Sequence, residues 1–274
     1  MNNQLYGERQ KRTKVFLDGL AKRILNVAAK NTRISSIALF EIAFRIWGSW
    51  RARDYLVRSC PTKTDMDLIA NDFAAILRCQ YDAFLQAAYL VNNPNECEAR
   101  GRLFSDYGFV EANRVARILT KQNTPWAKWM RNTPGFAEVE KERKARYDRV
   151  KQQFVDKKGK ACSHWYPGDL ASIARKLGLL DEYECLIAMN NSSVHTGPGS
   201  LGIGPPFMGA VGLDVAHSIL AKTLKLVMTH NGINAPKITE GLDQFVALFP
   251  NAPIPAGVSA KWENGEFVVE GGPP

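Results

Sequence analysis

Apolar residues recur at three- and four-residue steps along most of the chain, the spacing that places them on one face of a helix. The clearest example is residues 65–91, where two Asp open the pattern and Asn92-Asn93-Pro94 closes it. Similar spacing predicts further helices over residues 8–31, 35–60, 96–122, 136–158, 208–229 and 239–249. The pattern therefore predicts an all-α, bundle-like single domain of about seven to nine helices.

Three of these segments carry more specific signals. Ser35 or Ser36 is predicted to cap the second helix, because a hydroxyl there can accept from the first free backbone N–H groups. Residues 125–134 are expected to form a connector that contains two Trp. The segment 136–158 has few apolar positions, so its helix is predicted to lie on the surface or to arch away from the core.

The end of the chain has a different pattern from the rest. It is Pro-rich and then reads WENGEFVVE, in which Asn264-Gly265 is a strong signal for a tight β-turn. We expect a helical domain over residues 1–250, made of N-terminal basic helices (8–60) and a central bundle (65–230). Residues 251–274 are expected to form a tail with at most one small β-hairpin.

Basic residues are concentrated in two stretches of a chain whose net charge is +9. Residues 1–60 hold twelve Lys and Arg against four acidic residues, and residues 141–176 hold eleven against four. Such clusters are typical of a surface that binds a polyanion, and the alternative is a solvated basic face without a partner. Trp50, beside Arg51 and Arg53, fits base stacking or core packing, and core packing is the preferred interpretation. Both stretches are therefore candidates for RNA binding.

Signals for export, membrane insertion and cofactor binding are missing from the sequence. The N-terminus is polar, and the longest apolar stretch, residues 37–50, is short and interrupted by Glu41 and Arg45. The five Cys show neither zinc-site nor redox spacing, and the four His form no HExxH motif. We expect a reduced, cytoplasmic protein with no cofactor, no bound metal and no membrane association.

One stretch combines several chemically active side chains. Residues 181–199, DEYECLIAMNNSSVHTGPG, are expected to form a helix that ends in polar residues and runs into a Gly/Pro-rich loop. Ser192 and His195 are three residues apart there, so they share a helix face, with Asn191 beside them. Such a pair is either a hydrogen bond at a helix end or part of a catalytic group.

A second polar pair lies on the clearest predicted helix. Arg78 and Asp82 are four residues apart and share one face of it. The segment around them, ILRCQYDAFLQAAYL, resembles the LLRSxxEA helix of the domain-of-unknown-function family numbered 5677. HWYPGDLASIARKLGLLDEYECLIAMNNSSVHTG resembles that family's second signature, so the resemblance covers roughly residues 65–200. It implies a helical fold and a shared polar site made of Arg78, Asp82, Tyr183, Ser192 and His195.

That family in turn resembles the HEPN-type helical domains, many of which are metal-independent ribonucleases in toxin–antitoxin and anti-phage systems. Their signature is an Arg and a His separated by four to six residues; the Arg would stabilise the phosphorane charge and the His would move a proton at the 2′-hydroxyl. Here the Arg positions before His195 hold Ala, Met and Asn (188–190), so Arg78 would have to supply the guanidinium from another helix. Lys225 and His230 have the required spacing, with Lys in place of Arg.

Two hypotheses of function follow. The first is a protein that binds RNA in a bacterial or phage-related defence or stress role, with RNA cleavage as its extension. In that case Arg78 would hold phosphate and His195 would act as acid or base, with Ser192, Asn191 and Asp82 orienting them. The alternative is a non-catalytic helical interaction or scaffold subunit, whose basic face docks a protein partner or a second copy of the chain.

Overall fold

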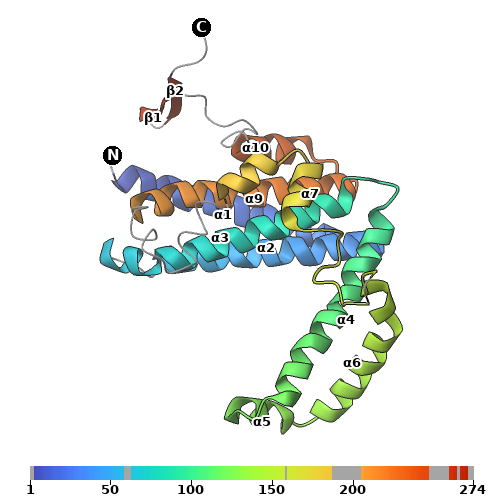
Figure 1. Ribbon diagram of the computed structural model, residues 1–274. Helices are drawn as coiled ribbons and strands as arrows, with labels where there is room; N and C mark the ends of the chain where they lie inside the picture. The colour runs from blue at the N-terminus through green and yellow to red at the C-terminus, as the bar shows by residue number, and fades with distance from the viewer. Residues whose placement is uncertain are drawn as a thin grey trace.

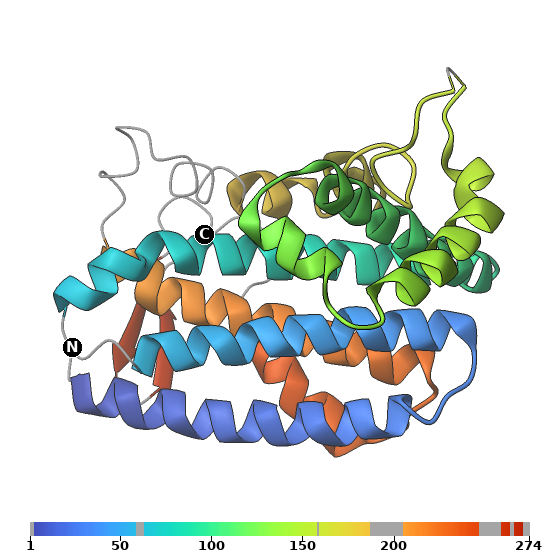
Figure 2. The same cartoon turned by 90° about the horizontal axis from the view of Figure 1, so that it is seen from below.

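The body of the protein is a bundle of four long helices. The computed structural model describes residues 3–58, 63–157, 159–186, 205–246, 259–263 and 266–270. The bundle consists of α1 (Asn3–Ala28), α2 (Ile34–Arg58), α3 (Lys63–Val91) and α9 (Pro205–His230). Figures 1 and 2 show these helices side by side, and α3 packs against both α2 and α9. The prediction of an all-α fold is confirmed.

Apolar side chains at helical spacing fill the bundle. Fully buried members include Leu17, Ile24, Leu39, Ile46, Leu85, Leu90, Ile219 and Leu220. Trp50 is buried among them, and its Nε1 donates to Nδ1 of His217 on α9 at 2.9 Å. Arg53 is also buried, with its guanidinium 5.6 Å from the centroid of the Phe73 ring. Core packing, the preferred interpretation of Trp50, is therefore confirmed, and Arg53 belongs to the core as well.

The prediction of a Ser cap on the second helix is wrong. Helix α2 begins at Ile34, so Ser35 and Ser36 lie inside it, and both are completely buried. The carboxylate of Glu98, from helix α4 (Cys97–Lys121), accepts hydrogen bonds from the backbone N–H (3.5 Å) and the hydroxyl of Ser35. A carboxylate from a distant helix thus satisfies a donor that a local cap would otherwise satisfy, which sequence spacing does not reveal.

The chain leaves the bundle as an arm after α3. Helix α4 (Cys97–Lys121) starts against α2 and runs outward, and α6 (Phe136–Val150) returns alongside it (Figure 1). The 3-10 turn η1 (Lys151–Phe154) follows α6. The segment predicted to arch away from the core therefore does so, although its α-helix ends eight residues early. We call residues 97–160 the arm.

The predicted connector at residues 125–134 contains a short helix that the sequence did not predict. That segment contains α5 (Pro125–Arg131) at the far end of the arm (Figure 1). Thr124 caps this helix by accepting a hydrogen bond from Ala127 N at 3.2 Å, and Pro125 occupies its first turn.

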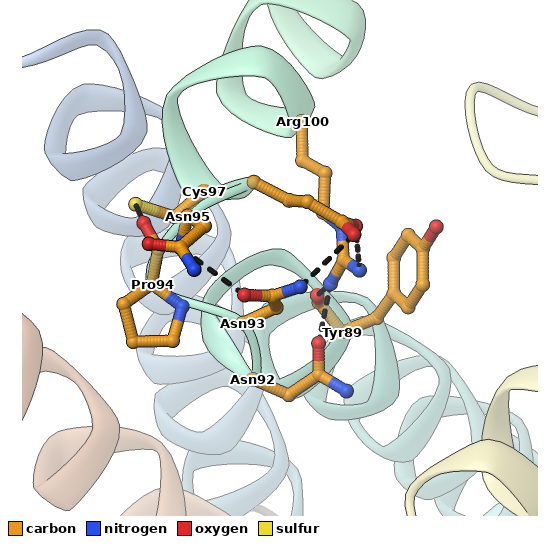
Figure 3. Close-up of polar contacts among 8 residues, drawn as sticks. Tyr89, Asn92, Asn93, Pro94, Asn95, Cys97 and Arg100 are labelled. Atoms are coloured by element: carbon orange, nitrogen blue, oxygen red, sulfur yellow. Dashed lines mark hydrogen bonds and ion pairs between the residues drawn. The ribbon is translucent and has the colours of Figure 1, made fainter.

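A buried arginine fixes the corner where the arm begins. Arg100 is only 4% exposed, and its guanidinium donates to the carbonyl oxygen of Tyr89, to Asn92 Oδ1 and to Glu96 Oε2 (Figure 3). The same group lies 4.1 Å from the centroid of the Tyr89 ring. Asn93 Nδ2 donates to Glu96 Oε1 at 2.9 Å. These contacts join the end of α3 to the start of α4 and set the direction in which α4 departs.

The remaining elements cover the bundle or follow it. Helix α7 (Leu170–Lys176) packs on α3, residues 180–186 are helical, and α10 (Pro236–Val246) packs on α9. Strands β1 (Ser259–Glu263) and β2 (Glu266–Glu270) pair antiparallel, with Ala260 opposite Val269. The hairpin predicted from Asn264-Gly265 is confirmed in its strands, while the two turn residues themselves lie outside the described part of the chain.

Candidate functional site

The sequence-predicted site residues divide into two groups. Arg78 and Asp82 lie on α3, in the described part of the chain. Asn191, Ser192 and His195 lie outside the described residues, so their approach to Arg78 stays a prediction.

Asp82 is the centre of a polar cluster on the face of α3 that α7 covers. Its Oδ2 is 3.8 Å from Nε of Arg78, with the two side chains 24% and 31% exposed. Its Oδ1 is buried and accepts no hydrogen bond from any described residue. Burial raises the pKa of Asp82 despite the opposing charge of Arg78. The carboxyl therefore keeps a proton to higher pH than an exposed Asp does.

Two tyrosines from later in the chain lie near enough to Asp82 for its charge to raise their pKa values. Tyr166 comes from the loop before α7, and burial followed by the charge of Asp82 raises its pKa to about 12. Tyr183 lies on the helical residues 180–186, and burial and the same charge raise its pKa, while the charge of Arg78 lowers it. The structure thus brings together three of the five positions implied by the family resemblance, namely Arg78, Asp82 and Tyr183.

A third tyrosine connects this cluster to α9. Burial, then the charge of Glu182, raises the pKa of Tyr81 far above its usual value. Lys222 of α9 donates to both carboxylate oxygens of Glu182, at 2.9 and 3.1 Å. We call Arg78, Tyr81, Asp82, Tyr166, Tyr183 and Glu182, together with Lys222, the Asp82 centre.

Sequence reasoning did not single out Tyr166, Glu182 or Lys222 as site residues. The available signal for Tyr166 was its place in the HWYPGD motif of the second family signature. The Glu182–Lys222 pair had no local signal, because its members are 40 residues apart. Within the described residues no cluster of three His, Cys, Asp or Glu could hold a metal ion.

A second group of polar residues resembles a hydrolytic triad but has the wrong order. Ser35 Oγ is 2.9 Å from Nε2 of His230, and the same hydroxyl donates to Glu98. A triad needs the carboxylate on the other nitrogen of the His, where it orients the ring. Burial and the charge of Arg33 also lower the pKa of His230. We interpret this group as a structural link between α2, α4 and the end of α9.

The arm is one of two strongly basic parts of the chain. It contains sixteen Lys and Arg against eight Asp and Glu, a net +8, which leaves +1 for the rest of the chain. The basic residues of the first two helices are partly neutralised within the bundle, where Lys14 pairs with Asp54 and Lys22 with Asp18 at 2.8 Å. Both members of each pair lie within residues 1–60, so that stretch keeps an excess of eight basic residues and is as basic as the arm.

An open groove of about 460 Å³ runs along the arm. One wall is the outer half of α4, and Tyr147 of α6 and residues 161–163 form the other. Arg114, Arg117 and Lys121 line it at three- and four-residue steps, so they share one face of α4. Arg114 pairs with Glu111 at 2.7 Å, whereas no ion pair of the described residues involves Arg117 or Lys121.

The arm groove was not predicted as a site, although its spacing is visible in the sequence. The charge analysis placed the second basic stretch at residues 141–176, and only Tyr147 and the 161–163 segment of that stretch line the groove. No helix among the described residues is long and apolar enough to cross a membrane.

Comparisons with known proteins agree with the predicted family. A match to a family of unknown function, DUF5677, spans residues 67–203. Searches of the curated proteins and of the solved structures each found no significant match. The matched segment contains the arm and, except for Lys222, the whole Asp82 centre. Because this segment is half of the 274 residues, the chain belongs to the family of unknown function DUF5677.

Proposed function

We propose that the protein binds RNA through the arm groove. One observation carries the proposal: Arg117 and Lys121 line an open groove in a segment of net charge +8, without a carboxylate partner among the described residues. Cations arranged along one wall attract a phosphate backbone and release its condensed counterions. The half-buried ring of Tyr147 also lines the groove and can contact a sugar or a base. RNA is preferred over DNA because of the resemblance to HEPN-type domains.

The salt dependence of binding tests this proposal. A labelled 20-nucleotide RNA is titrated with the protein over a range of salt concentrations, with fluorescence anisotropy as readout and a DNA of the same sequence as comparison. Each phosphate contact on a single strand contributes about −0.7 to the slope of log K against log salt. Arg117→Gln/Lys121→Gln should therefore weaken binding and make the slope shallower by about 1.4.

A matched variant separates the groove from general charge. Arg23 on α1 and Lys30 in the turn after α1 are both exposed, so Arg23→Gln/Lys30→Gln removes the same charge elsewhere. It should leave the slope nearly unchanged. Equal losses in both double variants, or no binding by the wild type, would count against the groove. The basic arm would then fit the alternative, an interaction subunit that docks an acidic protein partner.

The Asp82 centre supports a second candidate function, RNA cleavage without a metal. The observation that favours it is a carboxyl group with a raised pKa beside the guanidinium of Arg78. A protonated Asp82 could donate to the leaving 5′-oxygen while Arg78 stabilises the charged phosphorane. His195 would accept the proton of the attacking 2′-hydroxyl, in the role that the family resemblance gives it.

Cleavage is tested on total RNA and tRNA in the presence of a chelator. The wild type should produce fragments, whereas Asp82→Asn and His195→Ala should not, and both variants should bind RNA as the wild type does. Intact RNA with the wild type, with or without divalent metal, would reject cleavage and leave binding untouched. A defence or stress role, which the same resemblance suggests, stays a prediction.

A further inference from the structure

Two tryptophans at the end of the arm are displayed to solvent. Trp126 is 60% exposed and Trp129 is 64% exposed. They are three residues apart on α5, so the two indoles share one face of that helix. Large exposed aromatic side chains that lie together mark a binding surface more often than a chance exposure.

Helix α5 is held firmly although it has only seven residues. Ala127, between the two Trp in sequence, is 1% exposed, and α5 contacts both α4 and α6. Nη1 of Arg131 donates to the carbonyl oxygens of Leu119 (2.5 Å) and Gln122 (2.9 Å), at the end of α4. The hydroxyl of Thr124 caps the start of the helix. The indoles are therefore presented on an anchored turn, which reduces the entropy lost when a ligand stacks on them.

The anchored turn continues the wall of the arm groove. Gln122 lines the groove, and its carbonyl oxygen receives the hydrogen bond from Arg131 of α5. Lys128 lies exposed between the indoles in sequence and adds positive charge beside them. A ligand whose phosphates follow Arg117 and Lys121 would thus reach the two indoles at the end of its path.

We propose that Trp126 and Trp129 form a stacking platform for the unpaired bases of single-stranded RNA, whose backbone occupies the arm groove. This inference rests on the proposed function and names its substrate class. The charge of the arm favours a nucleic acid over an apolar protein surface. Stacking requires an exposed base face, which a single strand offers and a duplex hides. Since every base has such a face, the platform gives a preference for strandedness rather than for sequence.

The test compares single-stranded RNA and a blunt-ended RNA duplex of equal length, both with the full-length protein. A stacked base contributes about 5- to 150-fold in affinity. Trp126→Ala/Trp129→Ala should therefore bind single-stranded RNA at least 25-fold more weakly and change duplex binding by less than about threefold. Trp126→Phe/Trp129→Phe should restore most of the affinity, because an aromatic face remains. Val139→Ala, at an apolar position of the arm that is also 63% exposed, is the control and should match the wild type.

The outcomes distinguish failure of the stacking platform from failure of RNA binding by the arm groove. If the wild type binds neither RNA, the proposed function fails, and this inference fails with it. If the Ala variant retains its affinity for single strands, or loses affinity equally for both RNAs, the platform is overturned while groove binding stands. Far-UV circular dichroism and thermal melting establish that each variant is folded before binding is measured.

Discussion

The buried arginine at the corner between α3 and α4 gives the sharpest test of how the arm is held. Arg100→Met keeps a long apolar stem in a site that is only 4% exposed, but removes the guanidinium. The variant then lacks the donor to the carbonyl oxygen of Tyr89 and to Asn92 Oδ1 (Figure 3). It also lacks the positive charge near the end of α3, whose own last turn contains no basic residue.

The expected loss can be worked out from these contacts. A hydrogen bond from a charged donor contributes about 1.5 kcal/mol, so two acceptors that lose it cost about 3 kcal/mol. The lost interaction with the helix dipole adds about 0.5–1 kcal/mol. The variant also no longer buries a guanidinium, so its folded state avoids about 1 kcal/mol of the desolvation cost that the wild type carries. We therefore expect a net destabilisation of about 3 kcal/mol, or a Tm lower by roughly 6 °C.

Urea unfolding followed by far-UV circular dichroism measures this loss. Arg102→Met is the matched control, since Arg102 lies two residues further along the same helix and is exposed. That variant should stay within about 0.5 kcal/mol of the wild type. If Arg100→Met costs less than about 1 kcal/mol more than the control, the corner does not depend on these hydrogen bonds. The assignment of Arg100 as the residue that directs α4 would then be wrong.

Two further predictions concern packing at the base of the arm and the Asp82 centre. Gly101→Ala should destabilise the protein by about 1–3 kcal/mol, because the new Cβ would lie 2.7 Å from the Cα of Ser35. Gly108→Ala in the same helix is the control: its Cβ would meet nothing within 4 Å, so it should stabilise the protein by about 0.5–1 kcal/mol. Asp82→Asn should gain stability relative to the wild type between pH 4 and pH 7, since a raised folded-state pKa means that ionising the carboxyl, above its unfolded pKa of about 3.9, costs folding free energy. Urea titrations at the two pH values measure this difference, and a variant whose relative stability falls with rising pH would contradict the assignment of a raised pKa.

The long helices were predictable because each buries one regular apolar stripe in the bundle. Helix α5 was not, because it is seven residues long and buries only Ala127, so it has no periodicity to detect. Its one local signal was Thr124-Pro125, an N-cap followed by a first-turn Pro. The start of α2 was misplaced for a different reason, since the group that satisfies Ser35 is Glu98, 63 residues away. Local sequence preferences do not reveal a hydrogen-bond partner that only the tertiary structure brings close.

The candidate site shows the same division between local and distant information. The Arg78–Asp82 pair follows from four-residue spacing and was predictable. Its degree of burial was not, because Tyr166 and Tyr183 reach Asp82 from a loop and a helix about a hundred residues later. Asn191, Ser192 and His195 lie outside the described residues, so the catalytic half of the hypothesis is tested by the cleavage assay and not by geometry.

Counting charges treats the basic residues of the arm as equivalent, but their contacts divide them into two kinds. Arg143 is largely buried and donates to Asn113 of α4, and its bond with Glu140 raises its pKa. Arg146 lies 5.4 Å from the centroid of the Phe109 ring. These two side chains join α6 to α4 and replace apolar contacts that the α6 sequence does not provide. Arg117 and Lys121 do not join the two helices in this way, since both are exposed on the groove wall.

Neutral variants of the two kinds should therefore fail in different ways. Loss of Arg143 or Arg146 should loosen the packing of α6 on α4 and lower the thermal stability of the arm. Loss of Arg117 and Lys121 should leave the fold intact and change only the salt dependence of RNA binding. Some basic residues of the arm thus hold α6 against α4, and only the others are available to bind a polyanion.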